Sequence, residues 1–207
     1  MNAYRKTRGR APSRGYTVIE LVMAMGIFAI GITGVAAMQA ATSASNRHAK
    51  NLAIATSIAK TWQEELAIDA LRWTDDPVSL NANTLWIKNS IAPIWVLPLP
   101  NPANTMGPSF NALGNFIAQA NQAMFCVHIR LTPLLVAAGS GLVRTEVRVF
   151  WPKAGHAWEG GAAPCTAVPS AFRELDLSAT SSATNTELDN FHFLYTASAV
   201  RQSTGAP

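Results

Sequence analysis

The longest apolar stretch of the chain runs from Leu21 to Met38 and contains no charged residue. Val18 and Ile19 extend it upstream, and Glu20 is the one charge that interrupts it. At about 1.5 Å per residue, the segment from Val18 to Met38 would be roughly 30 Å long as a helix, which matches the hydrocarbon core of a bilayer. The pattern therefore predicts a helix long enough to cross a membrane.

The helical pattern continues past the apolar stretch, with an apolar residue at every third or fourth position. No proline occurs between Pro12 and Pro77, and the two aspartates directly before Pro77 are typical of a helix end. The sequence predicts one long helix within residues 16–76, with a membrane-spanning part at about 18–38 and an amphipathic part at about 39–74. The apolar stripe of the second part consists of Leu52, Ala55, Ala59, Trp62, Leu66, Ala70 and Trp73.

A secretory signal peptide is an alternative reading of the N-terminal segment, because it also combines a basic start with an apolar region. Its apolar region usually covers only about 7–15 residues and ends at a cleavage site that small residues mark. In this chain the helical pattern runs on instead, which favours a segment that stays part of the protein.

Residues 77–207 have the alternating patterns of a β-rich domain. In Met124–Thr132 the apolar residues alternate with polar ones, and Leu142–Trp151 repeats the pattern. Phe191–Val200 is predicted as a last strand, and Leu113–Ala123 as a short helix. Thr84–Ile91 and Ile94–Leu99 carry short β-like runs. We expect an α+β fold in which an antiparallel sheet packs on the amphipathic half of the helix through Trp62, Leu66 and Trp73.

Two segments of this domain have the composition of loops. Pro93–Pro108 holds five of the twelve prolines, and Ser178–Thr186 is a low-complexity stretch of small polar residues. We expect both segments to be extended and solvated rather than part of the core, with contact to a partner subunit as the alternative.

The net charge of +4 does not indicate a nucleic-acid partner, because the positive charge is concentrated at the N-terminus. Beyond the first fifteen residues, acidic residues slightly outnumber basic ones, so no basic face is expected on the folded part. The positive-inside rule places the N-terminus in the cytoplasm and everything after Met38 on the far side of the membrane. The basic residues that precede the apolar stretch are Arg5, Lys6, Arg8, Arg10 and Arg14.

Gly15-Tyr16-Thr17-Val18-Ile19-Glu20, after a basic leader and before an apolar helix, resembles the class III signal of type IV prepilins and pseudopilins. The resemblance implies a type IV pilin-like fold with a leader at 1–15, a long helix at 16–76 and a globular head at 77–207. It also implies that a prepilin peptidase cleaves after Gly15 and that the new N-terminus, Tyr16, is N-methylated. Glu20 would then set the register of assembly, because a carboxylate in a water-free helix bundle requires a cation such as an N-terminal amine.

A more specific resemblance is to minor pilins of the PilV type. Ala29–Gln39 follows their AIGxxGVAxxQ stretch, and Thr145–Pro152 is similar to their V-x-V-x-W strand. Major pilins often carry a helix-breaking proline about twenty residues into the mature chain, where this chain has Ala36 and Ala37.

The resemblance implies a subunit that helps to initiate a type IV pilus or sits at its tip, in motility or adhesion. The implied partners are the prepilin peptidase, other minor pilins, the major pilin and an adhesin-like tip protein. The subunit would wait among inner-membrane lipids with its head in the periplasm, and become extracellular in the assembled pilus. Two alternatives remain: a minor pseudopilin of a type II secretion system, and a single-pass membrane enzyme or sensor in which Glu20 is accidental.

Cys126 and Cys165 are the only cysteines, and both follow the predicted membrane segment. In an oxidising compartment two such cysteines more often form a disulfide than stay free, so we expect a bond between them. A buried free Cys126 is the alternative.

Nothing in the sequence indicates an enzyme, a cofactor or a metal site. The nucleophile-elbow, phosphate-loop, dinucleotide-binding and zinc-protease motifs do not occur. The four histidines have neither helical nor hairpin ligand spacing, so each is read as an ordinary surface or strand residue. They are His48, His128, His156 and His192.

Overall fold

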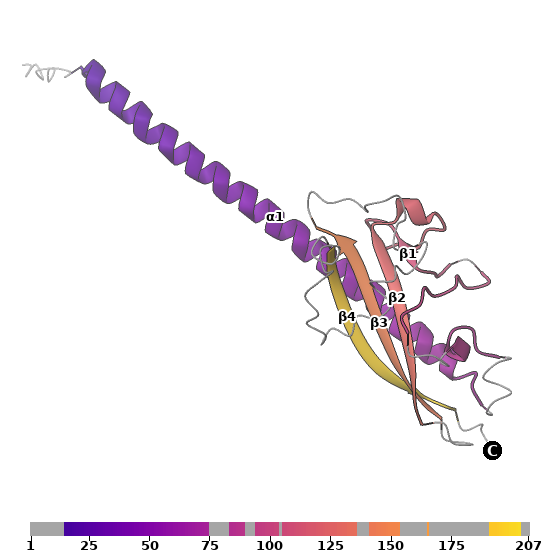
Figure 1. Ribbon diagram of the computed structural model, residues 1–207. Coiled ribbons are helices and arrows are strands. Elements are labelled where there is room, and N and C mark those ends of the chain that lie inside the picture. The colour runs from indigo at the N-terminus through magenta and orange to yellow at the C-terminus, as the bar shows by residue number, and fades with distance from the viewer. Residues whose placement is uncertain are drawn as a thin grey trace, which may run out of the picture. The chain divides into compact units, whose positions relative to one another are not determined.

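A computed structural model describes residues 15–74, 83–89, 94–103, 105–135, 141–153, 165 and 191–203. The leader at 1–14, the predicted helix end at 75–77 and the loop at 178–186 lie outside the described residues. In chain order the elements are α1 (Val18–Ala70), η1 (Ile87–Asn89), β1 (Ser109–Phe110), η2 (Ala120–Gln122), β2 (Phe125–Leu135), β3 (Leu142–Pro152) and β4 (Phe191–Arg201), as Figure 1 shows.

The chain divides into two compact units between Arg47 and His48. The described part of the first unit is the N-terminal portion of α1, and it has no core of its own, because its large apolar side chains are exposed. They include Val18, Ile19, Leu21, Val22, Met23, Met25, Ile27, Phe28, Ile30, Ile32, Val35 and Met38.

In the second unit, the C-terminal portion of α1 supplies one side of the hydrophobic core. The predicted stripe is confirmed from Ala55 to Ala70, whereas Leu52 is 40% exposed and lies outside the core. The helix ends at Ala70, and Trp73 reaches the core from the turn that follows. The buried residues of α1 are Ala55, Ile58, Ala59, Trp62, Leu66, Asp69 and Ala70.

The other side of the core is a four-stranded antiparallel sheet in the order β1-β2-β3-β4, which lies across this portion of α1 in Figure 1. The three long predicted strands are confirmed, and each extends one to three residues beyond the prediction. Val149 is paired with Val127 on one side and with Leu194 on the other. Because side chains alternate between faces, residues in register with Val149 all point to the core.

The two short β-like runs before the sheet are not strands. Residues 87–89 form a single turn of 3-10 helix, and of Ile94–Leu99 only Val96 pairs with the sheet, through a bridge to Ile129. In the first run, the buried carboxylate of Asp69 accepts hydrogen bonds from the three consecutive backbone N–H groups of Leu85, Trp86 and Ile87, at 2.8 to 3.0 Å. These donors converge on one group, which an extended strand would not allow.

The helix predicted over 113–123 is also absent, apart from the single turn η2. The side chain of Asn111 accepts the N–H groups of Leu113 and Asn115, which forms a turn in place of a helix. Gly114 adopts a positive φ of 81° in this turn, a conformation that a glycine adopts without steric cost.

The expectation of a solvated segment at 93–108 is wrong at Trp95, which is only 1% exposed. Its ring lies over the sheet face that points away from α1, where the sequence pattern placed polar residues. On this face His128, Glu146 and Arg148 are buried at 0%, 1% and 3% exposure, and the Trp95 ring lies directly against Arg148. Alternation identified the two faces of the sheet correctly, but both faces are covered.

Candidate functional site

The N-terminus of α1 is built as a reciprocal capping box. Thr17 precedes the first helical residue, and its hydroxyl accepts the N–H of Glu20 at 3.3 Å. In return the Glu20 carboxylate accepts the N–H of Thr17 at 3.5 Å. The arrangement follows the S/T-x-x-E pattern and satisfies two backbone donors that the helix itself cannot. Glu20 therefore has a local structural role that the sequence analysis did not identify.

The predicted cleavage residues lie directly before this cap and are accessible. Tyr16 is 88% exposed, and a Cβ added at Gly15 would meet no atom within 4 Å. The same holds for Gly26, Gly31 and Gly34 farther along the helix. Packing inside the chain therefore gives no reason for glycine at any of these four positions.

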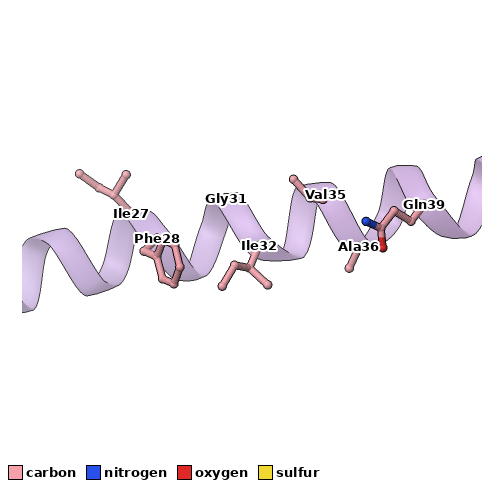
Figure 2. Close-up of a pocket in the computed structure, with 7 residues that line it drawn as sticks. All are labelled: Ile27, Phe28, Gly31, Ile32, Val35, Ala36 and Gln39. Atoms are coloured by element: carbon pink, nitrogen blue, oxygen red, sulfur yellow. The ribbon is translucent and has the colours of Figure 1, made fainter.

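Gly31 helps to line a hollow along one side of α1, which Figure 2 shows. Phe28, Ile32 and Ala36 lie along one edge of the hollow, and Gly31 lies between Ile27 and Val35 along the other. Because these residues recur every three to four positions, they form one continuous apolar strip on the helix surface. Gln39 ends the strip with a polar side chain.

α1 is long and apolar enough to cross a membrane. Its most apolar segment is not buried inside the chain. An exposed apolar surface of this size is expected in contact with lipid or with other apolar helices.

Comparison with known protein families gives one match. Residues 10–36 match the family model described as the prokaryotic N-terminal methylation motif. No curated protein and no solved structure matches the chain. The motif supports a type IV pilin or pseudopilin, which is a structural rather than a catalytic family.

The methylation motif implies processing by a prepilin peptidase and assembly with other pilins. The motif and the apolar portion of α1 together suit a membrane-anchored pilin. The match ends at residue 36, so the head must be analysed from its own residues.

In the head, the expected disulfide between Cys126 and Cys165 is confirmed. The two Cα atoms lie 5.3 Å apart, and both cysteines are buried. Cys126 belongs to β2, so the bond fastens residue 165 to the covered outer face of the sheet. Ala120 and Ala123, in and beside η2, pack against the bond together with Ile117.

The same outer face holds a cluster of charged residues around Glu146 of β3. The Glu146 carboxylate accepts two hydrogen bonds from Arg130, at 2.6 and 2.9 Å, and another from the Tyr195 hydroxyl. It also forms an ion pair with Arg144 at 2.9 Å. Burial raises the pKa of Glu146, but the hydrogen bonds and charges of these neighbours outweigh burial and lower it. Glu146 therefore stays ionised although it is buried.

A buried cation, Arg148, lies beside this cluster. Its guanidinium carbon is 4.0 Å from the centroid of the Trp95 ring, and its Nε donates to Nδ1 of His128 at 3.3 Å. Burial, with a smaller contribution from Arg130, lowers the pKa of Arg148 to about 9. The geometry fits a structural network that fixes Trp95 on the sheet, since cation–π contacts strengthen when they are desolvated.

The histidines are less dispersed than their sequence spacing indicated. His48 on α1 and His192 on β4 lie with ring centroids 4.6 Å apart. The sequence indicated this proximity only indirectly. His48 precedes Ala55 by two helical turns, and so lies on the face of α1 that packs on the sheet. Among the described residues, no group of three or more metal-ligating side chains is present.

Proposed function

We propose that this chain is a minor pilin of a type IV pilus, a structural subunit that helps to initiate assembly or sits at the pilus tip. The methylation motif at 10–36 carries the proposal at the level of the pilin superfamily. The PilV-like residues at 29–39 and the continuous, proline-free helix α1 favour the minor-pilin assignment within it.

Gly15 and Tyr16 fit a processing site, because an exposed, unhindered glycine is accessible to a peptidase. The proposal assigns cleavage to the bond after Gly15 and N-methylation to the amine of Tyr16. The mature protein would then begin at Tyr16 and consist of the long helix, observed as α1 (Val18–Ala70), followed by the head at 77–207. Until assembly it would span the inner membrane once, with its head in the periplasm.

The apolar strip around Gly31 fits a helix bundle in a filament. Small residues allow close approach of backbones, and the open space at Gly26, Gly31 and Gly34 is free for a neighbouring helix. In such a bundle water is excluded, and other minor pilins, the major pilin and a tip adhesin are the partners that the pilin assignment implies.

Glu20 would set the register of assembly through its charge. The capping box uses the Thr17 hydroxyl and one long hydrogen bond to the carboxylate, and the remaining lone pairs of Glu20 stay available. Thr17 remains an internal residue after cleavage at Gly15, so the cap persists in the mature chain. In the bundle, the free lone pairs would accept an N-terminal ammonium, either that of the same chain or that of a neighbour.

Two substitutions separate the charge of Glu20 from its capping role. Glu20→Gln removes the charge but keeps an oxygen that can complete the capping box, whereas Glu20→Ala removes both. Each variant replaces the wild-type gene in the native bacterium, and membrane fractions and sheared pili are probed for the protein. We expect both variants to be processed and stable in the membrane but absent from sheared pili, with few or short pili.

Each other outcome identifies a different role. Assembly by Glu20→Gln but not by Glu20→Ala would show that the cap suffices and that the charge sets no register. Wild-type levels of Glu20→Ala in sheared pili would refute an assembly role for Glu20. Loss of protein secretion with normal piliation on deletion of the gene would assign the chain to a type II secretion system.

A further inference from the structure

His48 and His192 both belong to the second compact unit, residues 48–207, and come from opposite sides of its helix–sheet packing. His48 is exposed on α1, and His192 is half-buried at the start of β4. The His192 ring also lies 5.5 Å, centroid to centroid, from the ring of Trp151, its partner residue on β3. His192 is therefore held in place by the sheet, while the edge of the pair at His48 is open to solvent.

The ring nitrogens of this pair are not used elsewhere in the described part of the chain. Neither histidine makes a side-chain hydrogen bond or an ion pair with another described residue, and no carboxylate acts on His192. Burial, followed by the nearby His48 and Lys153, lowers the pKa of His192. The neutral form of imidazole is the form that binds metal ions.

The separation of the two rings fits two ligands of one ion. With metal–nitrogen bonds of about 2.1 Å, the centroids of two bound imidazoles lie about 4.5 Å apart for the right angle of a tetragonal Cu²⁺ site and about 5.3 Å apart for the tetrahedral angle that Zn²⁺ prefers. The observed distance of 4.6 Å fits the tetragonal geometry directly, and tetrahedral binding requires the two rings to separate by less than about 1 Å. Imidazole pairs select borderline divalent ions such as Zn²⁺ and Cu²⁺ over Mg²⁺ and Ca²⁺.

From these observations we propose that His48 and His192 form a binding site for one divalent transition-metal ion, with water in the remaining coordination positions. The ion would join α1 to β4 where the second compact unit begins, at residue 48. Lys153 carries a positive charge close to His192 and opposes the ion. Two protein ligands and one opposing charge indicate a weak site, occupied only where the ion is plentiful.

The test measures Zn²⁺ and Cu²⁺ binding by the full chain in detergent micelles at pH 7.5. Calorimetry with Zn²⁺ compares wild type with His48→Gln and His192→Gln. Lys60→Gln is the control, because Lys60 is an exposed residue of the same helix that lies twelve positions from His48. His48→Gln changes only an exposed side chain of a helix, so it tests the site even where His192→Gln unfolds. The electron paramagnetic resonance spectrum of bound Cu²⁺ reports how many nitrogen ligands the ion has.

We expect one Zn²⁺ per wild-type chain, at least about tenfold weaker binding in both variants, and no change in Lys60→Gln. The Cu²⁺ spectrum should lose one nitrogen in His48→Gln. The site is refuted by absence of Zn²⁺ binding to wild type at about 1 mM, by wild-type affinity in His48→Gln, or by an equal loss in Lys60→Gln. None of these outcomes depends on pilus assembly, so the metal site and the proposed function are tested separately.

Discussion

Replacement of Asp69 by alanine should destabilise the head more than most single substitutions. Asp69 is 2% exposed, and its carboxylate is the acceptor for the N–H groups of Leu85, Trp86 and Ile87. Trp86 and Ile87 are themselves buried, so water cannot replace the lost oxygen at these two donors. Each buried donor without a partner costs about 1–3 kcal/mol, which gives about 2–6 kcal/mol for the two. Folded domains are stable by only about 5–15 kcal/mol.

Asp69→Asn should cost about half as much as the alanine substitution. One carboxylate oxygen accepts from both Trp86 and Ile87, and the other from Leu85 alone. An amide can keep its oxygen toward the two buried donors and turn its NH₂ group toward Leu85. Only the half-buried donor then loses its acceptor, and water can reach it.

Urea unfolding of the full chain in detergent, followed by tryptophan fluorescence, measures these differences. Glu64→Ala is the control, because Glu64 is a carboxylate on the same helix but exposed, with only a 3.9 Å ion pair to Lys60. Its loss should change the free energy of unfolding by less than about 0.5 kcal/mol. A loss below about 1 kcal/mol in Asp69→Ala would refute the argument that this carboxylate holds segment 85–87 on α1.

Three further predictions concern processing, the disulfide and pH. Replacement of Gly15 by a bulky residue should leave uncleaved precursor in the membrane. Mass spectrometry of the wild type should find a methylated chain that starts at Tyr16. An intact Met1 in sheared fibres would contradict this prediction. Loss of Cys126 or Cys165 should lower stability by about 3–4 kcal/mol, because the bond closes a loop with a sequence separation of 39, and two alkylatable thiols in the native protein would be inconsistent with the bond. The pKa of His192 lies below 6.5 in the folded chain. Metal-free protein should therefore keep its full stability above about pH 6.5 and lose stability as the pH falls through the folded pKa. The same loss in His192→Gln would exclude His192 as the cause.

Much of the architecture follows from the sequence alone, because it depends on local periodicity. Uninterrupted apolar and then amphipathic spacing predicts α1, and strict alternation predicts β2 and β3. The methylation motif is also contiguous, so it can be recognised without a structure. The disulfide could be expected as well, since the chain has only two cysteines and both follow the membrane segment.

Contacts between distant residues were decided only in the tertiary structure. Asp69 reads as one more polar helical residue until segment 85–87 turns back on it and replaces the predicted strand. His128 and Arg148 read as solvated positions until Trp95 covers them, and His48 and His192 are 144 positions apart in the chain but 4.6 Å apart in space. The physical reason is that periodicity reports which face of an element is apolar, whereas the cover on its polar face depends on chain packing that no local pattern encodes.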